Sequence, residues 1–586
     1  MDAVFKKISI ALWGAICFFA TIDTGFFVYP SLSQSLLECC CALFLMIVGI
    51  LYLFRLKNRT GIGKIELLVI LWVGYLLLHS LFMQRTEHYR FMYILTTLLL
   101  MPVLAQMLRG KLLTVRQLEN GCLLILILHL GCLMLQSIGV MASKNVFFAL
   151  TGCNENPNVT AMLVAVCVPI VYSRLVTSNH TWIMLISLIL SVVFLYFLKC
   201  RTAFLALGII TFIKIMAVHR VRNFLWTLRK KEIVCIVATV AVLVLIVGNV
   251  LYKSKRDSSD GRIFIWKIST LMIAENPFGC GVGMFQREYN YRQGDYFQSY
   301  TATEVEKRNA DVIYMAYNDY LEHGVEAGIV GVLFMLFFFS SVLLCAYRQR
   351  NVSAFAVLSA FAIMQMTNFV YSSIQAWIVL IVYASDVMSK ERTFGGRKIQ
   401  QGFLMLFLTI SSVMMSVECN YVVAQIRLKQ LIEKTKADVS DCNAKLIGDL
   451  LDIRSRVGTS EAYWNALADM YMKQGKHDKA MECMKNVLCY TSDARCLFKA
   501  FVCFDKCGRT SEGIKYIKNI SDMIPQNLQS RYILMMWYAR NRNIPAALRY
   551  AHDIDMISLK IQNAKSNYIK SVARQFIDDN ENRIKK

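Results

Sequence analysis

Four short polar segments, each beside a long apolar run, hold the residues of this sequence that are best suited to chemistry. An ionisable side chain at such a place is costly to bury, and it is therefore a functional candidate. Two of the segments contribute arginines, whose planar guanidinium groups match phosphate oxygens. Another contributes a carboxylate and an imidazole at helical spacing, which suits acid–base chemistry.

The first segment, residues 151–158, predicts a tight polar turn. Asn and Gly favour turns, and Asn158 is placed to cap the helix that follows. Asn156 and Asn158 are therefore candidate supporting residues of a site. An ordinary turn between two helices explains the same pattern.

The second and third segments offer arginines that can bind phosphate. Arg201 stands in a very short connection, at a helix end near the membrane interface, where an arginine can also simply snorkel to water. Arg262 begins an amphipathic stretch that reaches Trp266 and predicts a helix lying on the membrane. The Pro/Gly residues of 276–283 end that helix, and they are not a nucleotide loop, because no strand precedes them and no Gly-Lys-Ser/Thr follows. Arg287 comes next and adds to this basic surface.

The fourth segment leads directly into an apolar run and contains Tyr317, Asn318, Asp319 and His323. Asp319 and His323 are four residues apart, hence on one face of a helix, and can form an acid–base pair. The small residues after Glu326 continue that helix. A hydrogen-bonding pair at the interface is the alternative to catalysis.

Apolar helices must position these segments. The chain is 56% hydrophobic and 18% charged, whereas a soluble domain is about half apolar and a quarter charged. The excess is gathered in runs long enough to cross a hydrocarbon core of about 30 Å, which excludes a soluble protein. We predict an all-α, polytopic membrane protein of about 13 spans, the first of them an uncleaved helix. The predicted spans are residues 8–29, 34–54, 65–83, 91–108, 120–141, 159–177, 181–198, 202–218, 233–252, 324–346, 352–369, 374–389 and 402–418.

The net charge of the chain is +24, and the distribution of its Lys and Arg residues indicates how the chain crosses the membrane. If the N-terminus is cytoplasmic, Lys and Arg gather in the loops that then face the cytoplasm and are sparse in the short outer loops. The four polar segments, the long loop 253–323 and the chain from about residue 419 then face the outside. Nucleic-acid binding is not expected, because the soluble segments contain no basic stripe with interleaved aromatic residues.

A second domain is predicted over residues 419–586, after a transmembrane domain over 1–418 that includes the loop 253–323. Its hydropathy is that of amphipathic, soluble helices. A pattern around Trp464 and Ala468 recurs about 33 residues later around Ala500 and Phe504, at tetratricopeptide spacing. Residues 455–560 therefore predict about three tetratricopeptide-like hairpins, an unrelated α-bundle being the alternative. In either case it is a binding or spacing module.

The 19 cysteines do not form a metal-binding pattern, since there is no Cys-x-x-Cys pair and no His/Cys cluster. We therefore expect no metal and no cofactor. Five cysteines in the second domain are unusual for an oxidising compartment, where they are expected to be buried thiols or to form a disulfide. These five are Cys483, Cys489, Cys496, Cys503 and Cys507.

The order of the four segments resembles the O-antigen ligase superfamily of lipid-linked glycan transferases. The resemblance covers roughly residues 60–415, and the tetratricopeptide-like tail resembles one found on many members. The matching stretches are Asn156–Asn158, Arg201–Ala203, Gly261–Trp266 with Asn276–Phe285, and Tyr317–Gly331.

The resemblance implies a GT-C-like helical fold and activity at the outer face of the bacterial inner membrane. Members move a glycan from an undecaprenyl-diphosphate-linked donor to an acceptor hydroxyl, without metal or nucleotide sugar. By position, Arg201 and Arg262 would hold the departing diphosphate, with Arg287 nearby, and would stabilise charge that builds up in the transition state.

One position departs from the family pattern. Many ligases have His directly before the Asn of the fourth segment, as the proposed base, and this chain has Tyr317. A phenol with a pKa near 10 is a poor base at neutral pH. Tyr317 then only orients the acceptor, or Asp319 or His323 takes the proton, or the mechanism differs.

The sequence therefore predicts an O-antigen ligase or polymerase, with protein O-glycosylation as a further possibility of the same class. The acceptor would be lipid A-core, another lipid-linked unit or a protein, and the tail would recruit it or other glycan-assembly proteins. Membrane lipids surround the spans. A flippase for lipid-linked glycan would need charged residues along a path across the spans, and a membrane-tethered scaffold would leave the outer arginines unexplained.

Overall fold

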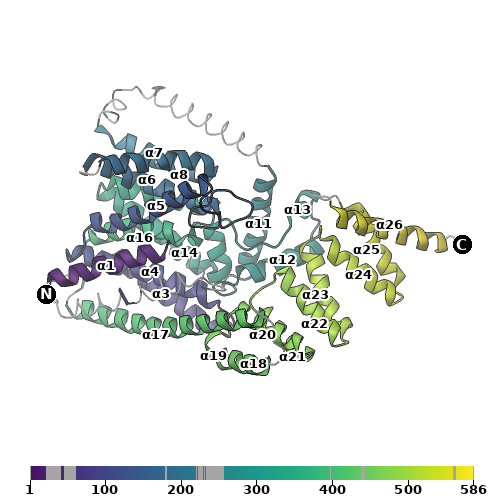
Figure 1. Cartoon of the computed structure of the whole chain (residues 1–586). Helices are drawn as coiled ribbons and strands as arrows, with labels where there is room; N and C mark the ends of the chain where they lie inside the picture. The colour runs from purple at the N-terminus through teal and green to yellow at the C-terminus, as the bar shows by residue number, and fades with distance from the viewer. Residues whose placement is uncertain are drawn as a thin grey trace. The chain divides into compact units, whose positions relative to one another are not determined.

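The computed structural model describes residues 2–21, 41, 43–44, 61–177, 181–219, 256–395, 397–436, 443–557 and 563–584, with single residues between 221 and 232. Across these ranges the regular structure is helical, with one isolated β-bridge between Ile62 and Phe394. The all-α prediction is confirmed (Figure 1). The predicted span 233–252 lies outside the described residues, as does 34–54 apart from three of its residues.

The chain divides into two compact units. The first unit comprises residues 1–82, 88–245 and 317–429, and the second unit comprises residues 83–87, 246–316 and 430–586. The long loop, which the sequence groups with the transmembrane domain, therefore belongs to the same compact unit as the tail.

The first unit is a bundle of apolar helices. Seven described helices of the chain are long and apolar enough to cross a membrane, and two shorter ones, α15 and α16, are also apolar. A polytopic membrane protein is thus confirmed, whereas the count of 13 spans and the GT-C-like arrangement stay predictions. The helices are α1 (Asp2–Phe19), α3 (Lys64–Phe82), α4 (His88–Arg109), α5 (Val115–Ser137), α6 (Pro157–Thr177), α7 (Thr181–Leu198), α8 (Arg201–Ala217), α14 (Asp319–Arg348), α15 (Val352–Thr367), the short 3₁₀ turn η1 (Val370–Ser372), α16 (Ile374–Ser389) and most of α17 (Arg397–Lys436).

Helices α4 and α16 form the centre of this bundle. Every residue of α4 from Met92 to Met107 is buried, and so is every residue of α16 from Gln375 to Met388. Helices that are apolar all round belong in such a place. By contrast, α7 leaves Trp182 and Tyr196 more than two-thirds exposed, as expected of a helix that faces lipid.

Helix α14 is interrupted at Gly328, where φ is 71° and ψ is −174°. The prediction that the residues after Glu326 continue one helix is therefore wrong, because a left-handed φ, which glycine adopts without strain, breaks the hydrogen-bond ladder. The hydroxyl of Tyr75 donates to the carbonyl of Ala327 at 2.5 Å, which satisfies an acceptor freed by the break. The first two turns of α14 are thus a short helix of their own.

The second unit begins with three helices of the long loop and continues with the helices of the tail. The loop helices are α11 (Arg256–Glu275), α12 (Phe285–Ser299) and α13 (Glu304–Asn309). The tail helices are α18 (Asn443–Asp452), α19 (Arg454–Val457), α20 (Glu461–Lys473), α21 (His477–Val487), α22 (Ala494–Lys506), α23 (Thr510–Met523), α24 (Leu528–Arg540), α25 (Ile544–Met556) and α26 (Ala564–Ile584).

Helices α20–α25 form three successive pairs, coloured green to yellow in Figure 1, over the residues where the repeat was predicted. Small residues allow the helices of a pair to approach closely: a Cβ on Gly513 would lie 2.6 Å from the Cβ of Phe504. The assignment of these pairs as tetratricopeptide repeats stays a prediction. The five tail cysteines are free thiols, three of them buried.

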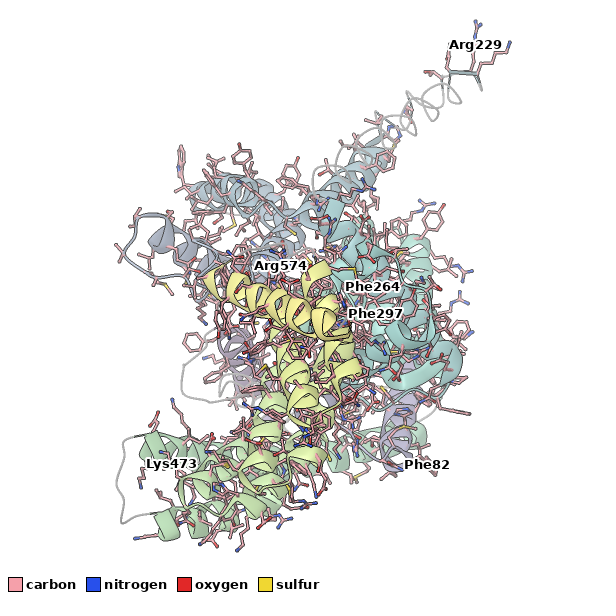
Figure 2. All side chains as sticks on the ribbon, turned by 90° about the vertical axis from the view of Figure 1, so that its right-hand side faces the viewer. Phe82, Arg229, Phe264, Phe297, Lys473 and Arg574 are labelled. Carbon is pink, nitrogen blue, oxygen red and sulfur yellow. The ribbon has the colours of Figure 1, made fainter. Side chains whose placement is uncertain are left out.

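Helix α11 ends at Glu275, directly before the Pro/Gly segment, as predicted. It packs on α12 through Phe264 and Phe297, whose ring centroids are 5.6 Å apart (Figure 2). In the Pro/Gly segment, Gly281 has a φ of 108°, and a Cβ there would lie only 2.1 Å from the carbonyl oxygen of Arg85. Only glycine allows this close approach of two backbones.

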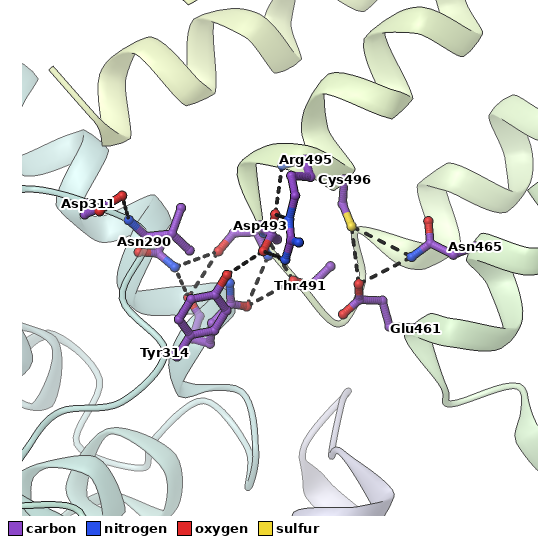
Figure 3. A network of polar contacts seen from close by, with 12 residues as sticks. Asn290, Asp311, Tyr314, Glu461, Asn465, Thr491, Asp493, Arg495 and Cys496 are labelled. Atoms are coloured by element: carbon purple, nitrogen blue, oxygen red, sulfur yellow. Dashed lines mark hydrogen bonds and ion pairs between the residues drawn. The ribbon is translucent and has the colours of Figure 1, made fainter. Parts of the chain in front are cut away.

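Helix α12 is fixed to the tail helices by buried amide side chains. Gln293, fully buried, donates to the carbonyls of Asp311 and of Met523 at 3.1 and 2.7 Å. Asn290, also fully buried, donates to the hydroxyl of Ser492 at 3.1 Å and belongs to the polar network of Figure 3. Hydrogen bonds donated by buried amides favour one arrangement of α12 on the tail, because a buried donor without an acceptor is costly.

The same network joins Tyr314 to Asp493, with the hydroxyl donating to the carboxylate at 2.5 Å (Figure 3). Burial alone raises the pKa of Asp493, but hydrogen bonds from Arg495 and Tyr314 hold it below its ordinary value. The loop and the tail thus pack together within the second unit.

Candidate functional site

Four ionisable side chains are buried on the short helix that opens α14: Asp319, Glu322, His323 and Glu326 are each at most 5% exposed. Burying a charge costs several kcal/mol unless a partner compensates it. The arrangement therefore requires specific partners on neighbouring helices.

Arg90 supplies the compensating charge. Its guanidinium lies 2.8 Å from the Glu322 carboxylate and 4.7 Å above the ring of Tyr371. The Arg90 and Glu322 side chains are 14% and 7% exposed, so little water screens this pair. A cation in the first turn of α4 opposes the helix dipole, and Glu322 offsets that cost.

His323 is held by Trp72, whose indole Nε1 lies 3.3 Å from the imidazole Nε2. An indole N–H can only donate, so Nε2 accepts and the proton of the neutral imidazole is on Nδ1. Nδ1 is buried and has no hydrogen-bond partner among the described residues. The ring also lies over Gly331, where a Cβ would come within 3.1 Å of Nε2.

Asp319 is held differently. Its Oδ2 accepts a hydrogen bond of 2.8 Å from the backbone N–H of Tyr371, while its buried Oδ1 has no hydrogen-bond partner within the described part of the chain. No hydrogen bond joins Asp319 to His323 in that part either. The two residues share a helix face, as predicted, but the structure does not pair them directly.

Asn318 caps this helix. Its side-chain oxygen accepts from the backbone N–H groups of Tyr320 and Leu321, both at 3.1 Å, which satisfies donors that a helix start leaves unpaired. Tyr317, directly before the cap, has a left-handed φ of 52°. Such a conformation costs a non-glycine residue energy and is common at functional sites. Its ring meets Phe369 edge to face at 5.4 Å.

The connection Asn368–Gln375 brings three of the four predicted segments together. Asn368 donates to the hydroxyl of Thr202, beside Arg201, at 3.4 Å. Gln375 donates to the side chain of Asn154, in the first segment, at 3.0 Å. Between them, the N–H of Tyr371 binds Asp319 of the fourth segment. Sequence reasoning did not single out this connection, although a polar Asn, two Ser and a Gln between two apolar helices were its signal.

Arg201 is the first residue of α8 and is half-buried. In the first segment, Asn156 rather than Asn158 caps the following helix: the Asn156 side chain accepts from the N–H of Asn158 at 2.9 Å. The prediction for Asn158 is thus wrong by two residues, because Pro157, which lacks an N–H, suits the first position of the helix.

Three predicted site residues belong to the second unit. The Trp266 indole donates to the carbonyl of Ala316 at 3.1 Å and so fixes the chain directly before the fourth segment. Arg262 is half-buried on α11. Arg287 donates to the carbonyl of Leu488 at 2.9 Å and also pairs with Glu288, so its guanidinium joins α12 to the tail.

Among the described residues, no three His, Cys, Asp or Glu side chains are placed to hold a metal ion. The absence of a metal requirement stays a prediction.

A family model described as O-antigen ligase matches residues 186–336 of the chain. The match runs from α7 into α14 and includes Arg201, Arg262 and the whole of the fourth segment. The resemblance to the O-antigen ligase superfamily, predicted from the order of the polar segments, is thus confirmed. No curated protein matches the chain. The match indicates a glycan-transferring, glycosyltransferase-like membrane enzyme.

Proposed function

We propose that this protein transfers glycan from an undecaprenyl-diphosphate-linked donor to an acceptor hydroxyl at the outer face of the bacterial inner membrane, as an O-antigen ligase or polymerase. In this proposal the N-terminus is cytoplasmic and the tail is periplasmic. One observation carries the proposal: the O-antigen ligase match, residues 186–336, includes the short helix that presents Asp319, Glu322 and His323 as a buried cluster.

Arg201 is proposed to bind the diphosphate. It opens α8, and a helix N-terminus offers unpaired N–H groups and a positive dipole end to an anion. Arg262 is proposed as the second phosphate ligand from the family resemblance. Charge that builds up on the departing diphosphate is then stabilised most in the transition state.

Asp319 is proposed as the base. Its Oδ1 has no hydrogen bond among the described residues, whereas His323 accepts through Nε2 and carries its proton on Nδ1. Asp319 would take the proton of the acceptor hydroxyl as that oxygen bonds to the sugar carbon. The bond between that carbon and the phosphate oxygen breaks, and its electrons leave with the diphosphate. Tyr317 would orient the acceptor.

The test is complementation of a deletion strain with the wild type, Asp319→Asn or Arg201→Ala, at matched membrane levels. Arg348→Ala, an exposed arginine at the other end of α14, is the control. We expect both site variants to lose the long surface-glycan ladder and to accumulate undecaprenyl-linked glycan, while the control restores the ladder. A single repeat on lipid A-core would identify a polymerase, bare core with polymer on the carrier would identify a ligase, and loss of glycan from a protein would identify a protein O-glycosyltransferase. Normal ladders from both site variants would refute the proposal.

A further inference from the structure

A cleft of about 1230 Å³ lies within the second unit, between the loop helices α12 and α13 and the tail helices α23–α25. Small-molecule sites usually enclose about 300–1,000 Å³. This cleft is larger, which favours an oligomeric ligand over a single small molecule.

The walls of the cleft are held in place before any ligand arrives. On the loop side, Gln293 of α12 binds the carbonyl of Met523, at the end of α23. On the tail side, Arg531 donates to the carbonyl of Pro525 at 2.8 Å and to the carboxylate of Asp553 at 2.7 Å. A preformed cleft loses little conformational entropy on binding.

The lining combines aromatic rings with exposed cations. Tyr538 and Tyr550 stack with centroids 5.7 Å apart and an interplanar angle of 13°, and Phe297 of α12 also lines the cleft. Five cationic and three carboxylate side chains line the cleft. Of the cations, Lys518 and Arg549 are exposed on the tail side. Among the carboxylates, Asp553 is already paired with Arg531.

We propose that this cleft binds an acidic oligosaccharide, namely a part of the donor or acceptor glycan away from the reacting sugar. Sugar rings present apolar C–H faces that pack on aromatic rings, and carboxylate or phosphate substituents pair with Lys and Arg. One wall, α12 and α13, lies inside the matched O-antigen ligase segment 186–336, which favours a glycan over a peptide. This inference rests on the proposed function for the identity of the glycan.

The binding test uses the full-length protein in lipid nanodiscs. The probe is an oligogalacturonate hexamer, which carries a carboxylate on every sugar, with maltohexaose as the neutral analogue and a hexa-aspartate peptide as the competing class. We expect the oligogalacturonate to bind best, and removal of Lys518 or Arg549 by alanine to weaken it about tenfold each, as for a lost charged hydrogen bond. Tyr538→Ala should weaken both saccharides.

Arg540→Ala is the matched control, because Arg540 is exposed on α24 but does not line the cleft. The proposal would be overturned if Arg540→Ala weakened binding as much as the cleft variants do, if neither saccharide bound, or if hexa-aspartate bound more tightly than the oligogalacturonate. Binding does not require transfer, so Asp319→Asn must retain it. If Asp319→Asn and Arg201→Ala both restore a normal ladder while cleft binding persists, the proposed function fails and the saccharide site stands. If transfer needs Asp319 but the cleft binds no saccharide, the saccharide-binding cleft is refuted and the proposed function stands.

Discussion

Arg90→Ala removes the cation that compensates Glu322, so it should destabilise the first unit strongly. Glu322 would remain buried, with a side chain only 7% exposed, and Tyr371 would lose the guanidinium above its ring. Removing one partner of a buried ion pair costs about 3–5 kcal/mol. Because whole domains are stable by only about 5–15 kcal/mol, this loss is a large part of the total.

Thermal unfolding of the purified protein in detergent measures the effect, and a fall in Tm on the order of 5–10 °C is expected. Glu322→Gln should also destabilise, since it leaves the guanidinium without its counter-charge. The double variant Arg90→Met with Glu322→Met removes both charges and should recover most of the lost stability, as replaced buried pairs do. Additive losses in the double variant, or an unchanged Tm for Arg90→Ala, would refute the reasoning.

Three further predictions concern other parts of the chain. Gly281→Ala should sharply lower the yield of folded protein, because its methyl would overlap a backbone carbonyl; Gly448→Ala, whose methyl meets open space, should not. Cys132 of α5 and Cys153 of the turn before α6, with sulfurs 3.3 Å apart, should form a disulfide if that turn faces the oxidising periplasm; quantitative alkylation of both thiols in intact cells without reductant would contradict that topology. Because the pKa of Asp493 is lowered in the folded state, its contribution is present above about pH 3.9, the ordinary value, and is lost in stronger acid. Asp493→Asn should therefore reduce the loss of stability that the second unit shows as the pH falls below that value, as measured by hydrogen exchange. An unchanged pH dependence of stability would contradict the lowered pKa of Asp493.

The polar segments could be found from the sequence because each shows its chemistry locally. Asp319 and His323 stand out as ionisable residues at the start of an apolar run, and the repeat spacing marks the helix pairs of the tail. Arg90 could not be assigned in the same way, since its partner is 232 residues away in the sequence. The break at Gly328 was missed because glycine is also common as a packing residue inside membrane helices.

The connection Asn368–Gln375 shows a second limit of sequence reasoning. Its residues contain no family motif that the sequence reveals by itself, and their importance comes from backbone and amide contacts to Asp319, Thr202 and Asn154. A backbone N–H that binds a carboxylate cannot be recognised from the sequence, because every residue except proline has one. Such contacts are visible only once distant helices are placed side by side.

The docking of α12 on the tail constrains how the protein is made. Asn290 and its partner Ser492 are 202 residues apart in the chain. At a synthesis rate of about 5–20 residues per second, the loop leaves the ribosome roughly 10–40 s before the partner surface exists. During that interval the amides of Asn290 and Gln293 can be satisfied only by water. Folding of the second unit must therefore finish after the last apolar helix of the first unit has been made, and a nascent chain stopped there would carry an unfinished loop that quality-control proteases can recognise.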